Sequence, residues 1–177
     1  MPQDVPGPFR AFRVHVQDGG VRRGPEVVGP EVLPDHDVTV RVLASSLNYK
    51  DALSASGNRG VTRSYPHIPG IDAAGVVAAS RDPRFAVGDA VVCTGFDLGM
   101  DTPGGFAEYV RVPGDWLVRQ PPGITAEEAM ALGTAGLTAA LALGRLAAVG
   151  VGPHLGPLVV TGASGGVGSL AVWLAAR

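Results

Sequence analysis

The feature that most constrains the fold is an abrupt change of composition after Pro121-Pro122-Gly123. Before it, short β-like segments alternate with Gly and Pro turns, a pattern typical of an all-β, barrel-like unit. Val38 to Val42 alternates apolar and polar side chains, as a half-buried strand should. Residues 19–34 are patterned weakly and are expected to be the least structured interior region. The strands are expected at residues 12–16, 38–44, 73–79, 90–94, 106–112 and 116–118.

Beyond the change, Ala, Leu, Gly and Met dominate without β-branched runs, which predicts helices. Thr125, followed by Glu127 and Glu128, predicts a helix start, because a hydroxyl caps free N–H groups and acidic side chains favour the first turn. A second helix is expected over residues 135–148, ending near Gly150. The chain is therefore expected to combine an all-β part with an α/β part.

A glycine-rich turn occupies residues 162–168, GASGGVG. Residues 157–161 before it predict a buried parallel strand, and residues 169–177 after it predict a helix. Strand, glycine turn and helix in this order are typical of dinucleotide binding, because glycines let backbone amides and a helix N-terminus approach a pyrophosphate. Ala163 stands where the fingerprint has its first glycine, so a turn that merely packs helix on strand stays an alternative.

Charge and cysteine content exclude several classes of protein. The net charge is −2 and no run of like charges occurs, so nothing indicates binding to nucleic acid or to an anionic membrane. No apolar run approaches the roughly 20 residues of a membrane span, and residues 1–8 lack a signal-peptide pattern, which favours the cytoplasm. Cys93, the only cysteine, allows neither an internal disulfide nor a multi-cysteine zinc site and is expected to be an inert core thiol.

Three further segments occur in the order and spacing of the medium-chain dehydrogenase/reductase superfamily. They are SSLNYKDAL at residues 45–53, IPGIDAAG at 68–75 and GTAGLTA at 133–139. With the glycine-rich turn and GDWLV at 114–118, they resemble the zinc-independent acrylyl-CoA reductase and quinone oxidoreductase branch of that superfamily. The resemblance covers nearly the whole chain from about residue 36 onward.

This resemblance implies a mixed β and α/β fold. A GroES-like β-barrel catalytic domain is expected over residues 1–125, followed over residues 126–177 by linking helices and the first strand and helix of a Rossmann NADP-binding domain. The active site is expected in the cleft between them. Because one strand and one helix do not make a sheet, the chain alone is expected to be inactive. Its apolar strand and helix are expected to drive self-association or a homodimer.

Zinc-dependent members of the superfamily hold their metal with two cysteines and a histidine. Asn48, Ile71 and Thr134 stand at these positions, and none replaces a thiolate or an imidazole as a zinc ligand. The resemblance therefore implies a metal-free, NADPH-dependent reductase. Hydride would add to an activated C=C bond, such as that of acrylyl-CoA, while charge develops on a thioester or quinone oxygen near hydrogen-bond donors.

The resemblance points to Asn48, Tyr49, Asp51 and Asp72 as catalytic residues. Tyr49 is expected to lie against the nicotinamide and the substrate, Asn48 to donate to a carbonyl oxygen, and both aspartates to orient neighbours or relay a proton. Asp51 has the alternative of capping a helix or facing solvent. Asp72 lies between apolar residues, where an unpaired carboxylate is costly, which favours a functional or networked role. Lys50 is expected to be a solvated surface residue.

Cofactor contacts are expected from Tyr49 and from two later segments. Relatives place the turn with Thr134 and Thr138 beside the nicotinamide amide, although both hydroxyls could instead serve a helix start. The phosphates are expected at Ser164, Gly165, Gly166 and Val167. The four histidines lack ligand spacing and are expected to be structural or exposed: His15, His36, His67 and His154.

Two rival functions stay open beside the reduction of an enoyl thioester. One is reduction of quinones by the same cofactor. The other is a non-catalytic GroES-like module with a structural or interaction role. For the enzyme, the expected partner is a small-molecule substrate, with no nucleic acid and no membrane.

Overall fold

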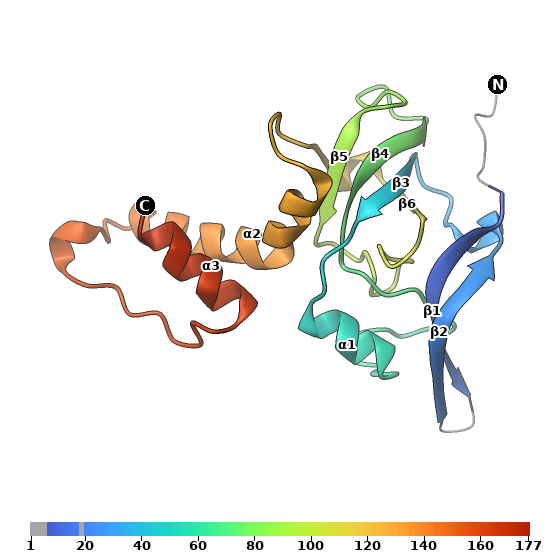
Figure 1. The fold of residues 1–177 in the computed structure, drawn as a ribbon, viewed down its shortest axis with the longest axis horizontal. Helices are drawn as coiled ribbons and strands as arrows, with labels where there is room; N and C mark the ends of the chain where they lie inside the picture. Colours follow the sequence, from blue (N-terminus) through green and yellow to red (C-terminus); the bar gives the residue numbers. More distant parts are fainter. Residues whose placement is uncertain (1–6, 18–19) are drawn as a thin grey trace. The chain divides into compact units, whose positions relative to one another are not determined.

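The computed structural model describes residues 7–17 and 20–177. The chain divides into two compact units, Met1–Met130 and Ala131–Arg177, and each is described by itself (Figure 1). The strands are β1 (Phe9–Gln17), β2 (Gly20–Val28), β3 (Val38–Ala44), β4 (Asp72–Ser80), β5 (Ala90–Thr94), β6 (Tyr109–Val112) and β7 (Leu117–Arg119). The α-helices are α1 (Tyr49–Ala55), α2 (Ala126–Ala148) and α3 (Gly166–Ala175), and short 3₁₀ helices occur at Pro30–Val32, Gly114–Trp116 and Pro153–Leu155.

The first unit is built on antiparallel strands. Five of them form a sheet in the order β6-β3-β4-β5-β7, while β1 and β2 form a separate ribbon. Isolated bridges from Ala11 to Ala107 and from Val14 to His67 connect the ribbon to the rest of the unit. The all-β unit expected from the sequence is therefore present.

The largest hydrophobic cluster of this unit is built on the five-stranded sheet. Cys93 is buried within it, as expected for an inert thiol, and burial raises the pKa of Cys93 to about 12. The apolar residues that alternate along the strands face the same core: Val38, Val40, Val77, Val91, Val110 and Val112.

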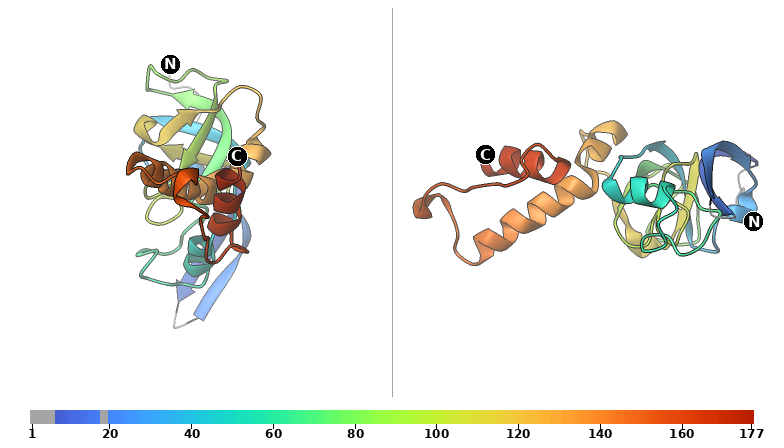
Figure 2. Two further views of the ribbon diagram at one scale, coloured as in Figure 1. Left: turned by 90° about the vertical axis from the view of Figure 1, so that its left-hand side faces the viewer. Right: turned by 90° about the horizontal axis from the view of Figure 1, so that it is seen from below.

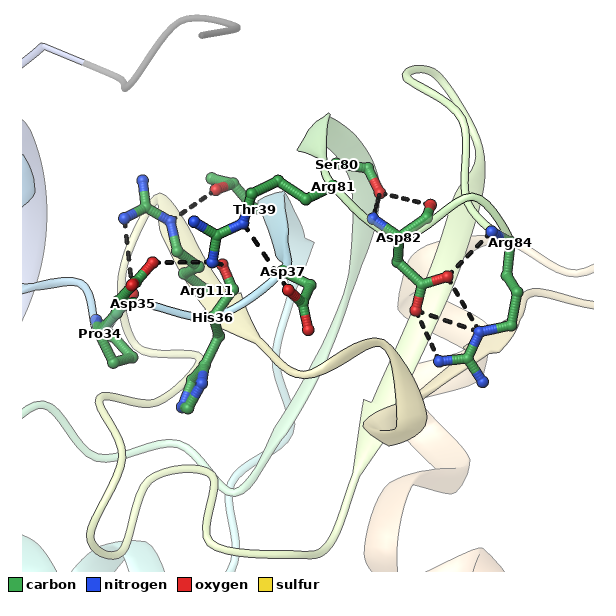
Figure 3. A network of polar contacts seen from close by, with 10 residues as sticks. All are labelled: Pro34, Asp35, His36, Asp37, Thr39, Ser80, Arg81, Asp82, Arg84 and Arg111. Atoms are coloured by element: carbon green, nitrogen blue, oxygen red, sulfur yellow. Dashed lines mark hydrogen bonds and ion pairs between the residues drawn. The ribbon is translucent and has the colours of Figure 1, made fainter.

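Ion pairs fasten the turn after β4 to the segment that precedes β3 (Figure 3). The Nη2 atom of Arg81 lies 2.7 Å from Asp35 Oδ1, and its Nε lies 3.7 Å from Asp37 Oδ1. Nearby, Arg84 Nη2 lies 2.6 Å from Asp82 Oδ2. Both arginines are solvent-exposed, so each pair adds at most about 1 kcal/mol to stability, and their role is to order the turn.

Two parts of the first unit differ from the sequence-based expectation. The region expected to be least structured contains β2, which pairs with β1 along its whole length, from Phe9 opposite Val28 to Gln17 opposite Gly20. Phe106 was expected to begin a strand but lies before β6, and its carbonyl accepts the N–H of Phe12 at 2.7 Å. In both places the pairing partner is β1, which directly precedes β2 in the sequence but lies far before Phe106.

Helix α2 begins with the predicted cap. The hydroxyl of Thr125 accepts the N–H of Glu128 at 3.1 Å, and the Glu128 carboxylate accepts the N–H of Thr125 at 2.7 Å. Gly133 has non-helical dihedral angles, so α2 consists of two helical segments that meet there. The chain leaves the helix at Gly150, whose φ of 84° favours glycine, as predicted. By length and composition α2 could cross a bilayer, a criterion that core helices of soluble proteins also meet.

The strand predicted over residues 157–161 is not formed. No strand is assigned there, and the Val159 side chain is 83% exposed. A parallel strand needs hydrogen-bonding neighbours, and the second unit offers none among its described residues. The following helix, α3, begins at Gly166 rather than at Ser169 and lies beside α2 (Figures 1 and 2). A Cβ on Gly166 would lie 3.4 Å from the Cβ of Ala135.

Candidate active site

A partly buried hydrogen-bonded cluster lies where β4 and α1 begin. The Asn48 amide nitrogen donates to Ser46 Oγ and to Asp72 Oδ2, each at 2.9 Å. The Ser46 hydroxyl also donates to the Asp72 carboxylate, and the Ser45 hydroxyl donates to the Asp72 carbonyl at 2.7 Å. Asp72 is fully buried. The networked role expected for Asp72 is therefore what the structure shows, because two side chains satisfy its carboxylate.

Asp51 fastens the start of α1 to the loop that leads into β4. Its Oδ2 accepts the N–H of Asn48 at 2.7 Å, and its Oδ1 accepts the N–H groups of Gly70 at 3.1 Å and Ile71 at 3.0 Å. The side chain is fully buried, so the solvent-facing alternative is wrong, whereas the capping alternative describes its bond to Asn48. Burial raises the pKa of the Asp51 carboxyl; the three backbone hydrogen bonds oppose this rise, and the charge of Asp72 adds to it.

Glycines let two loops meet at this cluster. A Cβ on Gly105 would lie 2.4 Å from the carbonyl oxygen of Asp72, and a Cβ on Gly70 would lie 2.5 Å from the nitrogen of Phe106. The loops are joined by a hydrogen bond of 2.8 Å from Gly105 N to the carbonyl of Gly70. Sequence reasoning missed both Ser46 and Gly105. The position of Ser46, two residues before Asn48 in the same motif, was the available signal for it.

The predicted catalytic residues divide into two groups. Asn48, Asp51 and Asp72 lie together, whereas the Tyr49 side chain is 80% exposed. In the described part of the chain the Tyr49 hydroxyl forms no recorded hydrogen bond, so it is available to a ligand. Both N–H groups of the Asn48 amide are engaged by Ser46 and Asp72, and the Asn48 side chain forms a capping box with Asp51 at the start of α1. Donation from Asn48 to a substrate oxygen stays a prediction.

The predicted cofactor residues other than Tyr49 lie in the second unit. The Thr138 hydroxyl donates to the Thr134 carbonyl, four residues earlier within α2, at 2.7 Å, so both the cofactor role and the helix-start alternative stay predictions. Ser164, Gly165, Gly166 and Val167 are exposed, and Gly165 caps α3 without a side-chain bond.

The shape of the turn before α3 requires glycine at both of its ends. Gly162 has a φ of 63°, and a Cβ on Gly168 would lie 2.2 Å from the carbonyl oxygen of Gly162. At the start of a helix the first backbone N–H groups lack partners within the helix. A tight, exposed turn of this kind can hold a phosphate group.

The structure also shows where the residues at the zinc-ligand positions of the superfamily lie. Asn48 donates within the partly buried cluster, Ile71 is buried with its hydrocarbon side chain, and Thr134 belongs to the second unit. Over residues 7–17 and 20–177, no group of three or more His, Cys, Asp or Glu side chains could hold a metal ion.

Comparison with known proteins shows to which family this architecture belongs. Residues 34–122 match the family "Alcohol dehydrogenase GroES-like domain". The chain is 50% identical over 94% of its length to the Escherichia coli K12 protein named "Probable acrylyl-CoA reductase AcuI", of which it covers 51%. It is 49% identical over 82% of its length to the acrylyl-CoA reductase AcuI of Ruegeria pomeroyi, of which it covers 44%.

A solved structure agrees with these relatives. The yhdH oxidoreductase from Salmonella enterica, in complex with NADP, matches with a TM-score of 0.90 and 50% identity, over 93% of this chain and 51% of that one. The chain therefore spans about half the length of the proteins that it matches.

Proposed function

Because the chain belongs to the GroES-like alcohol dehydrogenase family of the medium-chain dehydrogenase/reductase superfamily, we propose that it acts in NADPH-dependent reduction of an activated C=C bond. The substrate class is an enoyl thioester such as acrylyl-CoA, supported by the names of two relatives. The proposed location is the cytoplasm, where such a small-molecule substrate would be met. Quinone reduction is the alternative activity.

The glycine-rich turn of the second unit fits the phosphates of an adenine dinucleotide cofactor. The turn of Gly162 to Gly168 is closed by a backbone approach that only glycine permits, and it opens α3 with exposed N–H groups. We assign the phosphates to the backbone of Ser164, Gly165, Gly166 and Val167. When bound there, NADPH supplies the hydride.

The first unit supplies the groups that act on the substrate. Hydride addition to the β-carbon of an enoyl thioester places negative charge on the thioester oxygen, and a proton then reaches the α-carbon. The exposed hydroxyl of Tyr49 is the donor assigned to that oxygen, because it has no recorded partner within the described residues. Asn48 and Asp51 fix the backbone from which Tyr49 projects, since both are held by partly buried hydrogen bonds.

The observation that carries a zinc-independent reaction is the pairing of Asn48 with Asp72. At a position where zinc-dependent relatives have a cysteine, this amide donates its N–H groups to a buried carboxylate and a hydroxyl. Ile71, at the histidine position, is a hydrocarbon. These residues lack the thiolate and imidazole donors of a zinc site, so the oxygen would be stabilised by hydrogen bonds instead.

The test measures NADPH oxidation with acrylyl-CoA and, separately, with a benzoquinone, each with and without a metal chelator. The assay uses this chain joined to the part of the E. coli relative that it does not match. We expect faster turnover of acrylyl-CoA and no effect of the chelator. Turnover of the quinone alone would favour the alternative activity. If neither NADPH binding by fluorescence nor oxidation were detected, the non-catalytic module would be the better description.

A further inference from the structure

We propose that Lys50, Arg59 and Arg63 form a phosphate-binding surface for the nucleotide portion of a coenzyme A thioester. We call these three residues the cationic surface. The inference rests on the proposed function and deepens it, because it identifies what would favour a coenzyme A ester over a quinone. Coenzyme A carries a diphosphate and a ribose phosphate, whereas a quinone carries no phosphate.

Lys50 and Arg63 meet at one turn of the first unit. Lys50, the only lysine of the chain, is exposed on α1, and its Nζ lies 3.7 Å from the sulfur of Met100. Arg63 lies beside the next residue, Asp101: its Nε is 3.5 Å from one carboxylate oxygen, and its backbone N–H donates to the other at 3.3 Å. Since Met100 and Asp101 are consecutive, the two cations lie on either side of a single turn.

Arg59 joins the same surface through the loop after α1. Its Nη1 donates to the carbonyl oxygen of Arg63 at 2.8 Å, and its guanidinium carbon lies 5.9 Å from the ring centroid of Tyr65. The Tyr65 hydroxyl in turn donates to the carbonyl of Ser54 at 2.8 Å, which ties the loop back to α1. The three cations therefore occupy one ordered segment rather than separate parts of the unit.

The charge of this surface is only partly balanced. Lys50 and Arg59 form no ion pair among the described residues, and the Arg63 side chain remains 84% exposed beside Asp101. Asp101 is the carboxylate that pairs with this surface, so the three cations outnumber the acids bound to them. The chain as a whole carries a net charge of −2, which makes a local positive excess unusual for it.

The cationic surface lies on the same helix as part of the candidate active site. Lys50 directly follows Tyr49 on α1, so the cationic surface and the hydroxyl assigned to the substrate oxygen belong to the same short helix, with the two side chains pointing in different directions. Guanidinium groups present paired N–H donors that match phosphate oxygens, and lysine adds a mobile point charge. The apolar and amide part of the thioester would then extend from the cationic surface toward Tyr49.

The experiment measures binding of free coenzyme A to the chain by calorimetry, which requires no turnover. The test variant is Lys50→Gln/Arg59→Gln/Arg63→Gln. The matched control is Arg41→Gln, which removes one exposed cation from β3. NADPH is titrated in parallel, because it also carries adenosine phosphates, and pantetheine serves as the phosphate-free analogue.

We expect the triple variant to bind coenzyme A about tenfold more weakly, since exposed charge contacts each change affinity by up to about fivefold. Added salt should weaken binding to the unchanged chain and have little effect on the variant. Arg41→Gln, NADPH binding and pantetheine binding should show no such change. Equal affinity of the triple variant and the unchanged chain, or a loss confined to NADPH, would overturn the proposal. If the unchanged chain bound coenzyme A as expected, but the assay under the proposed function showed no turnover of acrylyl-CoA, the result would count against the proposed function alone.

Discussion

The Oδ1 atom of Asp51 lies 3.0 Å from the backbone nitrogen of Ile71, although the two residues are 20 positions apart in the sequence. This bond joins the first turn of α1 to the loop that leads into β4. Its partner bonds from Gly70 and Asn48 to the same carboxylate complete a buried junction. The candidate site thus depends on a carboxylate that supports the backbone and is not itself open to a ligand.

Replacing Asp51 by asparagine should destabilise the first unit. The new amide group cannot accept hydrogen bonds at both former oxygen positions, so at least one buried N–H among Asn48, Gly70 and Ile71 loses its partner. We expect a decrease of about 2 kcal/mol in the free energy of unfolding, measured with urea. Asp35→Asn is the control, because that carboxylate is 88% exposed, and it should change stability by less than about 1 kcal/mol. Equal effects of the two substitutions would argue against the junction.

Removing the Tyr49 hydroxyl should affect the reaction and leave the fold intact. Because this hydroxyl is exposed and has no recorded partner in the described structure, Tyr49→Phe should leave the melting temperature unchanged. It should reduce kcat for acrylyl-CoA by about a hundredfold if the hydroxyl stabilises the developing charge.

Tyr65→Phe is the matched control for this substitution. Its hydroxyl donates to the carbonyl of Ser54, so its loss should cost about 1 kcal/mol of stability and leave kcat unchanged. Both assays use the chain joined to the unmatched part of the E. coli relative. An unchanged kcat in Tyr49→Phe would remove Tyr49 from the proposed chemistry.

Signals that act over a few residues were predictable from the sequence. The cap at Thr125 and the helix end at Gly150 depend on neighbouring backbone groups, and both are confirmed. Burial of Cys93 follows from its apolar run and is also confirmed. The apolar setting of Asp72 predicted a satisfied carboxylate, because an unpaired one would be costly.

Features that depend on distant partners were not predictable in this way. The Ser46 hydroxyl meets a carboxylate 26 positions away, and nothing local marks that contact. Strand β2 was missed for a different reason: Gly24 and Pro25 weaken its local strand pattern, and it forms through pairing with the preceding strand, β1. The run around Val159 has the composition of a buried strand and is exposed, because composition alone does not supply the neighbouring strands.

The turn before α3 gives a prediction about cofactor binding. Gly168→Ala would bring a Cβ within 2.2 Å of the Gly162 carbonyl oxygen, so the turn must open. We expect NADPH affinity, followed by fluorescence, to fall about tenfold or more. Gly144→Ala is the matched control: nothing lies within 4 Å of its Cβ position in α2, so it should keep NADPH affinity and add about 0.5–1 kcal/mol of helix stability. If Gly168→Ala bound NADPH with unchanged affinity, the turn would not be the phosphate-binding segment.

The second unit should self-associate through its exposed apolar side chains. Leu141, Leu155 and Val159 are 65%, 66% and 83% exposed, and a hollow of about 520 Å³ lies among apolar residues that include Leu143 and Leu146. Exposed apolar surface of this kind favours association. Light scattering after gel filtration should show a mass that rises with concentration, and Leu155→Glu/Val159→Glu should lower it. A concentration-independent monomer would contradict this prediction.

His67 should make the stability of the first unit depend on pH. Its side chain is 6% exposed, its Nε2 lacks a hydrogen-bond partner within the described structure, and burial lowers its pKa from the usual 6.5. As the pH falls below about 6.5, the unfolded chain binds a proton that the folded chain resists, so stability present above this pH is lost as the pH falls toward the lowered folded pKa. This histidine should contribute a slope of up to about 1.4 kcal/mol per pH unit. His67→Phe keeps a ring beside Tyr65 and should flatten the slope of urea unfolding free energy below that pH, whereas parallel slopes in the two proteins would show that His67 is not the titrating group.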